Sequence, residues 1–219
     1  VQARLCGARV VRVPGPRQAA SDAVMAAAES SYYASHLWNP FFIQGHMSAA
    51  FELWEQYGRT VPSAVVVPLG SGGYLEGVYR GFRLLRNAGY ADRVPRIFGI
   101  QAAACEPLHR AFEAGLGDFM AVETRPGIAE GIAVSRPPRA REVLAAIRES
   151  GGRTLSVSEE EILAAHGGLL RTGIYAEPTS AAALAGWMRL SADERGDAVV
   201  LLSGNGLKES EKLAKLYPL

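Results

Sequence analysis

The sequence predicts an α/β fold with a mainly parallel, twisted sheet flanked by helices. Short β-branched apolar runs alternate with helical segments along the chain, which is the pattern of β-α units. The runs at 64–67 and 198–202 are apolar throughout. Such continuous runs are typical of strands that are covered on both faces, as in a parallel sheet.

Five elements are expected in the first half of the chain, in the order strand, helix, helix, strand, helix. β-branched residues indicate the strands, whereas alanine content and amphipathic spacing indicate the helices. Their expected bounds are, in chain order, 9–13, 19–30, 48–57, 64–67 and 75–88.

Seven more elements are expected in the second half, in the order strand, helix, helix, strand, helix, helix, strand. Gly115 and Gly151 mark helix ends, and Ser158 with Glu161 forms a capping box at a helix start. The expected bounds are 96–101, 106–114, 139–150, 154–157, 158–172, 180–190 and 198–202. The proline-containing segment 127–139 is the expected long connection over a site.

Composition excludes several classes of protein. The 219 residues are 48% hydrophobic, enough to bury a sizeable core, and a net charge of +1 favours neither nucleic acid nor an anionic membrane as a partner. No apolar run approaches the ~18 residues of a membrane span. With only Cys6 and Cys105, we expect free thiols in a reducing cytoplasm. The histidines show no metal-ligand spacing, so no metal site is expected; they are His36, His46, His109 and His166.

The most informative motif is a glycine loop that joins a predicted strand to a predicted helix. A strand that turns directly into a helix N-terminus directs several backbone N–H groups at one point, which suits a phosphate group. The loop fits neither a dinucleotide fingerprint nor a Walker A loop. A tight turn without a ligand remains the alternative. The candidate binding residues are Gly70, Ser71, Gly72, Gly73 and Tyr74.

Two further candidates lie near other strand and helix ends. Ser203 opens a second glycine loop, 203–206, directly after the last predicted strand. Ligands of parallel sheets gather at the carboxyl ends of strands, so the two glycine loops could share one crevice. Glu177 precedes Pro178 at a helix start and is either a partner of the helix dipole or a site residue. For Ser203, the alternative is a serine that caps a turn.

Five segments match one known family in the expected order. The sequence resembles the pyridoxal-phosphate enzymes of the tryptophan-synthase β-like fold, and among them threonine synthase. The matching segments are 39–45, 67–73, 95–102, 177–182 and 203–208.

The resemblance implies a role for each candidate residue. Residues 70–74 would hold the phosphate of pyridoxal 5′-phosphate through backbone N–H groups, and Ser203 would face its pyridine nitrogen. A neutral hydroxyl does not force that nitrogen to stay protonated, which suits elimination and replacement chemistry. Glu177 would lie near the cofactor ring. A homodimer is also implied.

The family's Schiff-base lysine lies in an N-terminal segment that matches nothing here. The chain contains only Lys208, Lys212 and Lys215, so we expect no catalytic residue within it and place that lysine upstream of Val1. The chain then corresponds to the C-terminal two-thirds of an enzyme. Residues 1–35 would end the small domain and 36–219 would form most of the large, cofactor-binding domain.

The expected parent activity is a threonine-synthase-like lyase that converts O-phosphohomoserine to threonine and phosphate. The substrate is then a small amino acid. One departure concerns specificity: residues 46–48 read His-Met-Ser, where threonine synthases often carry a lysine and a threonine. A second is Tyr74, which replaces a small polar residue. The alternatives are a serine or threonine deaminase or a β-replacement enzyme of the same fold, and a non-catalytic binding protein that lost its lysine.

Overall fold

The computed structural model describes residues 2–15 and 17–217. The chain divides into two compact units, Val1–Asn39 and Pro40–Leu219, and the first contains α1 (Gln2–Leu5) and α2 (Arg17–Ala27). The domain boundary expected between residues 35 and 36 stays a prediction. Within the described residues, no helix has both the length and the apolar character that a membrane crossing requires.

The strand expected at 9–13 is wrong. These residues form irregular backbone in the structure, and the side chains of Val10 and Val11 are 45% and 68% exposed. Their β-branched side chains favour extended backbone. A strand also needs a neighbour for its ladder of hydrogen bonds, and no described strand pairs with this segment.

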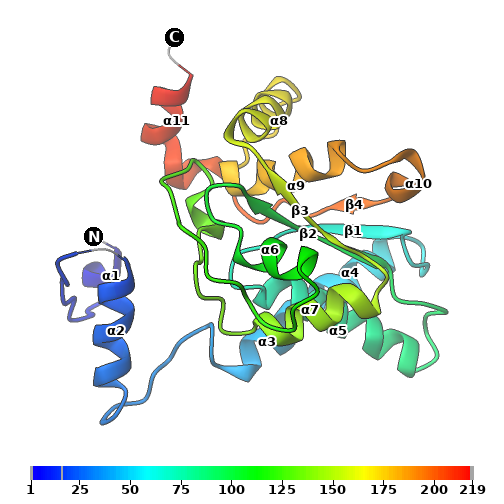
Figure 1. The fold of residues 1–219 in the computed structure, drawn as a ribbon. Helices are drawn as coiled ribbons and strands as arrows, with labels where there is room; N and C mark the ends of the chain where they lie inside the picture. Colours follow the sequence, from blue (N-terminus) through cyan, green and yellow to red (C-terminus); the bar gives the residue numbers. More distant parts are fainter. Residues whose placement is uncertain (1, 16, 218–219) are drawn as a thin grey trace. The chain divides into compact units, whose positions relative to one another are not determined.

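The second unit contains a four-stranded sheet of β1 (Ala64–Pro68), β2 (Arg96–Ala102), β3 (Thr154–Val157) and β4 (Val199–Val200). The strand order is β3-β2-β1-β4, and every neighbouring pair is parallel (Figure 1). The α/β class and the parallel sheet predicted from the sequence are therefore confirmed.

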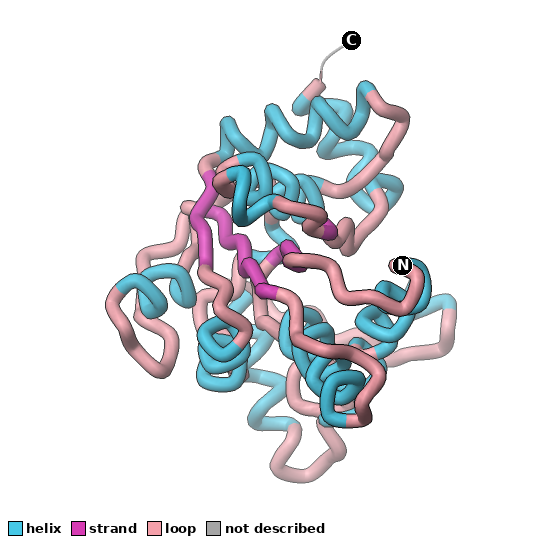
Figure 2. The backbone as a smooth tube through the Cα atoms, turned by 90° about the vertical axis from the view of Figure 1, so that its right-hand side faces the viewer, coloured by secondary structure: helices cyan, strands magenta, loops and turns pink. Residues whose placement is uncertain are grey.

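Helices cover both faces of this sheet, as Figures 1 and 2 show. The β-branched side chains of β1 alternate between two cores: Val65 and Val67 lie in one, whereas Val66 lies in the other. The first core packs against α5 and α7, and the second against α8 and α9. The helices are α3 (Pro40–His46), α4 (Ser48–Gln56), α5 (Gly73–Asn87), α6 (Pro107–Glu113), α7 (Ala140–Glu149), α8 (Glu159–Arg171), α9 (Pro178–Met188), α10 (Ala192–Arg195) and α11 (Ser210–Leu216), with short 3₁₀ turns η1 (Glu130–Ile132) and η2 (Gly206–Glu209).

Three parts of the second unit differ from the sequence-based expectation. The last strand is shorter than 198–202 and half-buried rather than fully covered, because β4 pairs only with β1 in the described sheet. Helix α3 was not predicted, although Pro40 follows Asn39, and proline at the first helical position is a common helix start. Helix α10 also went unpredicted, although Ser191 and Glu194 form a capping box at its start.

Candidate functional site

The first glycine loop joins β1 to α5 with a sharp turn at Gly72. Leu69 still follows the sheet, because its N–H donates to the Ile100 carbonyl at 2.7 Å. Gly72 then has a φ of +86° and caps α5 without a side-chain hydrogen bond. This left-handed conformation favours glycine. The chain therefore passes from a buried strand into a 15-residue helix over only four residues, 69–72.

The backbone N–H groups at this turn are available to a ligand. Within residues 2–15 and 17–217, no protein group accepts a hydrogen bond from the N–H groups of residues 71–74. The first helical bond runs from the Glu76 N–H to the Gly72 carbonyl at 2.9 Å. The N-terminus of α5 also carries about half a positive charge from the helix dipole. An anion such as phosphate fits this arrangement.

Close packing behind the loop explains its glycines. A Cβ atom added to Gly72 would lie 2.2 Å from Cγ2 of Val143 in α7. A Cβ atom added to Gly70 would lie 3.0 Å from Cα of Ile132 and 3.2 Å from the carbonyl oxygen of Gly131. Residues 127–139, which we call the strap, therefore lie directly against the glycine loop, as the sequence predicts.

The second glycine loop lies beside the first. Strands β1 and β4 are parallel neighbours, with Val66 opposite Val200, and the Leu201 N–H donates to the Val66 carbonyl at 2.9 Å. Both loops therefore leave the same edge of the sheet. Ser203 is exposed, and its hydroxyl makes no hydrogen bond to the described part of the chain.

In the second loop, both backbone groups of Gly204 bond to the start of α9. The Gly204 N–H donates to the Ser180 hydroxyl at 2.9 Å, and that hydroxyl donates to the Gly204 carbonyl at 3.2 Å. The same carbonyl accepts the Glu177 N–H at 3.0 Å. Ser180 is fully buried, so α9 fixes the position of this loop.

Glu177 lies at the meeting point of α9 and the second loop. Its side chain is 12% exposed, and its carboxylate lies 3.7 Å from the Lys208 ammonium. A Cβ atom added to Gly204 would lie 2.1 Å from the Glu177 Oε1 atom. The structure thus brings Glu177 and the 203–206 loop together. The link to the first loop runs through the strap, where a Cβ atom on Gly131 would lie 2.6 Å from the Thr179 hydroxyl.

Tyr74 follows the first glycine loop and is half-buried. Burial raises the pKa of its phenol, and the negative charge of Glu52 raises it further. The hydroxyl is therefore protonated at neutral pH and can donate a hydrogen bond. The ring of His46 packs edge-on against Tyr74, with ring centroids 5.4 Å apart.

Two further residues lie at this site: His46, noted in the sequence only among the histidines and as a departure at 46–48, and Glu76, which was not singled out. The His46 Nδ1 atom is buried and has no hydrogen-bond partner in the described chain, and it would lie 3.9 Å from a Cβ atom on Gly73. Glu76, in the first turn of α5, is 1% exposed and pairs with Arg80 at 2.5 Å and Arg139 at 3.4 Å. The glycines at 73 and 77 were the available signal, since they indicate close packing on this face of α5.

Comparison with known proteins identifies a family. The family described as pyridoxal-phosphate dependent enzyme matches residues 1–204. The chain is 34% identical over 216 residues to threonine synthase of Methanocaldococcus jannaschii, covering 96% of this chain and 53% of that protein. It is 36% identical over 191 residues to threonine synthase of Methanosarcina acetivorans, covering 86% and 47%. The chain thus spans about half the length of these relatives.

Solved structures of the same fold also match. A threonine deaminase of T.th. superposes with a TM-score of 0.74 at 28% identity, covering 94% of this chain and 65% of that chain. Maize serine racemase superposes with a TM-score of 0.76 at 16% identity, covering 98% and 64%. The fold is therefore the tryptophan-synthase β-like fold expected from the sequence.

Proposed function

Because the chain belongs to the family of pyridoxal-phosphate-dependent enzymes, we propose that it forms the phosphate-binding side of a lyase similar to threonine synthase. The cofactor is pyridoxal 5′-phosphate, which supplies an electron sink when bound. The proposed reaction of the whole protein converts O-phosphohomoserine and water to threonine and phosphate. Two relatives that are 34% and 36% identical carry the name threonine synthase, which supports this choice.

The observation that carries the proposal is the open N-terminus of α5. The unpaired N–H groups of residues 71–74, the helix dipole and the closely packed glycines form a cradle of the size and charge that a phosphate needs. The buried carboxylate of Glu76, in the first turn of α5, is paired with two arginines, so its negative charge is compensated. The residues present therefore fit the phosphate group of the cofactor. We assign this group to Gly70, Ser71, Gly72, Gly73 and Tyr74.

Ser203 and Glu177 are proposed to contact the cofactor ring. Ser203 lies after the carboxyl end of β4, beside the phosphate loop that follows β1. Its hydroxyl can donate to, or accept from, a pyridine nitrogen. Glu177, 12% exposed beside Gly204, would shape the wall of the site next to Ser203. The bonds of Gly204 to Ser180 and Glu177 fix the backbone next to Ser203.

The lysine that bonds the cofactor in this family is not assigned to any lysine of the chain. Lys212 is engaged with Ile128 and Glu130 at 2.8 Å, and Lys208 lies near Glu177 with 73% of its side chain exposed. We keep the proposal that the bonding lysine precedes Val1 in the whole protein.

Binding of phosphate is tested with pyridoxamine 5′-phosphate and pyridoxamine, which lack the aldehyde that reacts with any lysine. We expect the protein to prefer the phosphorylated compound. Ser71→Asp places a carboxylate among the loop N–H groups and should weaken pyridoxamine 5′-phosphate binding by at least about tenfold. Ser71→Asn is the matched neutral control. Equal affinity for the two compounds in the unmutated protein would contradict the phosphate site.

The reaction is tested on the whole protein with O-phosphohomoserine. Release of phosphate together with threonine supports the proposal. Phosphate without threonine, or turnover of serine or threonine alone, argues against it. The homodimer remains a prediction from the resemblance and the cytoplasmic location one from the two cysteines, and sedimentation of the whole protein would test the dimer.

A serine or threonine deaminase is the second candidate. It is favoured by the likeness to a solved threonine deaminase at 28% identity. The same assay separates the two functions, because a deaminase converts threonine to a keto acid and ammonia without releasing phosphate.

A further inference from the structure

Ile128, in the strap, is held by two charged side chains that come from different helices. Its N–H donates to the Glu159 Oε2 atom at 2.7 Å. Its carbonyl accepts the Lys212 ammonium at 2.8 Å. Hydrogen bonds to charged groups are roughly twice as strong as those between neutral groups. We call Glu159 and Lys212, with the Ile128 backbone between them, the Ile128 clamp.

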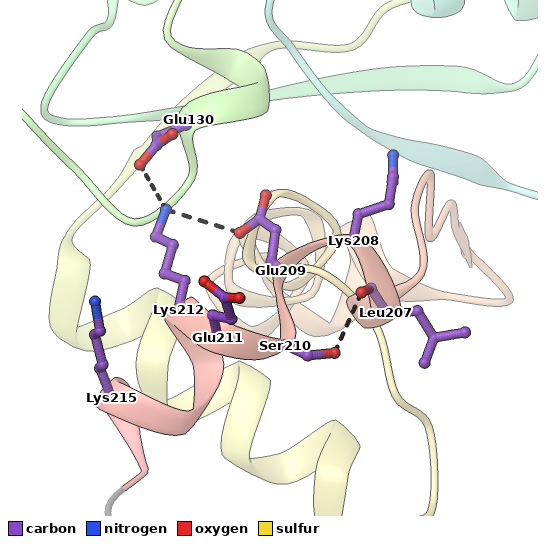
Figure 3. Close-up of a pocket in the computed structure, with 8 residues that line it drawn as sticks. All are labelled: Glu130, Leu207, Lys208, Glu209, Ser210, Glu211, Lys212 and Lys215. Carbon is purple, nitrogen blue, oxygen red and sulfur yellow. Dashed lines mark hydrogen bonds and ion pairs between the residues drawn. The ribbon is translucent and has the colours of Figure 1, made fainter. Parts of the chain in front are cut away.

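Lys212 fastens the strap at a second point. Figure 3 shows its ammonium between Glu130, at 2.8 Å, and Glu209, at 3.7 Å. These residues line a cavity of about 570 Å³ between η1 and α11. Lys215 lies one turn further along α11 and lines the same cavity, but none of the interactions drawn in Figure 3 involves it. The two lysines therefore share a location and differ in their contact with the strap.

Glu159 holds the strap from the other side. It is the first residue of α8, and its Oε1 atom is buried without a hydrogen-bond partner in the described chain. A Cβ atom added to Gly127 would lie 2.8 Å from that oxygen, so the carboxylate lies against the strap backbone. Burial of a charged group is costly unless it is hydrogen-bonded. The bond from Ile128 is therefore a main compensation for this carboxylate.

A movement at Ile128 would be transmitted to the glycine loop. The 3₁₀ turn η1 begins two residues later, and the Ile132 N–H donates to the Ala129 carbonyl at 3.1 Å. Ile132 and Gly131 are the residues that approach the Cβ position of Gly70 to 3.0 and 3.2 Å. The strap is thus fixed at Ile128 and packed at Gly70, with one short turn between the two points.

We propose that Glu159 and Lys212 are positioning residues for the cofactor phosphate. By fixing Ile128, they hold the strap against Gly70 and keep the loop N–H groups in the geometry that binds phosphate. Preorganisation of this kind increases affinity because less freedom is lost on binding. The inference rests on the proposed function and assigns it two residues that lie outside the glycine loop.

The test measures two properties of the purified protein and its variants. Hydrogen–deuterium exchange of peptides from 127–134 reports on the strap. Dissociation constants for pyridoxamine 5′-phosphate and pyridoxamine separate the phosphate-dependent part of affinity from the rest. The variants are Lys212→Met, Lys212→Arg and Glu159→Ala, with Lys215→Met as the matched control.

We expect Lys212→Met and Glu159→Ala to accelerate exchange in the strap and to raise the dissociation constant of pyridoxamine 5′-phosphate by about threefold or more. Pyridoxamine affinity should stay unchanged. Lys212→Arg should restore both properties in part, and Lys215→Met should alter neither.

Three results overturn the proposal, and they are distinguishable. If the unmutated protein prefers the phosphorylated compound but the variants bind it equally well, the clamp has no positioning role. If the unmutated protein shows no preference, the phosphate site itself is wrong, and the clamp proposal fails with it. Equal weakening for pyridoxamine would indicate a general structural defect and would also count against the proposal.

Discussion

The two glycine loops follow the carboxyl ends of β1 and β4, on the same side of the sheet, but differ in the hydrogen bonding of their backbones. In the first, the N–H groups of residues 71–74 bond to no acceptor in the described chain. In the second, both backbone groups of Gly204 are bound by α9. Unbound N–H groups suit contact with an anion, whereas a backbone fixed as that of Gly204 is suits the presentation of the neighbouring side chain, here that of Ser203.

This difference also determines what each glycine tolerates. Behind Gly72 lies a branched core side chain, Val143, in a packed helix. Behind Gly204 lies the flexible end of Glu177. A side chain added in the first loop should therefore destabilise the protein by overpacking the core. A change in the second loop should act mainly through lost or shifted polar contacts.

The largest effect is expected for Gly72→Ala. The new Cβ atom would meet Cγ2 of Val143 at 2.2 Å in a backbone with φ of +86°. Overpacking and left-handed strain together should lower the free energy of unfolding by about 2–4 kcal/mol. Urea denaturation measures this change.

Gly89→Ala is the control for Gly72→Ala. Gly89 lies beyond the other end of α5 with φ of +79° and nothing within 4 Å of an added Cβ atom. Here the free energy of unfolding should fall only by the cost of backbone strain, about 1 kcal/mol. Equal losses at both positions would show that packing behind the first loop is unimportant.

A smaller loss of stability is expected for Ser180→Ala, which removes the hydrogen bonds between the second loop and α9. The Gly204 N–H loses its acceptor, and because this group is half-buried the loss should lie near the lower end of the about 1–3 kcal/mol of a buried one. Stability should fall by that amount, and exchange of the Gly204 amide should accelerate while pyridoxamine 5′-phosphate affinity changes little. A large loss of phosphate affinity would mean that the two loops do not act separately.

Gly204→Ala is expected to cost less, about 1 kcal/mol. Its Cβ atom would displace the Glu177 carboxylate, the mobile end of a side chain, rather than a core group. Thermal denaturation gives the stability. If Gly204→Ala proves as damaging as Gly72→Ala, then Glu177 is held as firmly as Val143.

The smallest effect concerns the opposite, amino-terminal edge of the sheet. The Arg153 guanidinium lowers the pKa of Glu194 from its ordinary value of 4.5 to about 2, through contacts of 2.7 and 3.1 Å. A lowered carboxyl pKa contributes stability above pH 4.5, and that contribution is lost as pH falls from 4.5 to 2. Because Arg153 is 41% exposed, Glu194→Gln should cost no more than about 1 kcal/mol.

Urea midpoints of the unmutated protein and Glu194→Gln, measured between pH 7 and pH 3, test this prediction. The difference should be constant above pH 5 and should shrink at lower pH. Phosphate affinity at pH 7 should not change, since neither glycine loop lies at this edge. A stability difference that grows on acidification would contradict the assignment.

The sequence predicted the parts of the fold that carry local signals. Apolar β-branched runs placed β1, β2 and β3 within one residue of their observed ends, and Ser158 with Glu161 marked the start of α8. The segment 9–13 failed because the local pattern cannot show whether a partner strand exists. The half-buried state of β4 depends likewise on its place in the strand order.

The sequence predicted the parts of the candidate site that glycines mark. Both glycine loops were predicted because each follows a strand, and their common position at the carboxyl ends of the strands followed from the parallel sheet. The roles of Ser180 and Glu76 did not, because their partners are distant in sequence: Ser180 bonds Gly204, 24 residues away, and Glu76 pairs with Arg139, 63 residues away. The contact of Lys212 with Ile128 spans 84 residues.

The placement of the lysines has a consequence for chemical labelling. All three lysine side chains lie within residues 208–215, and Lys212 is 29% exposed whereas Lys208 is 73% exposed. Acylation of the lysines of this chain is therefore confined to one short stretch, residues 208–215, and the order in which these lysines react reports how firmly that stretch is attached. Acylation of Lys212 would remove the charge that holds Ile128, so a labelled sample is also a modified one.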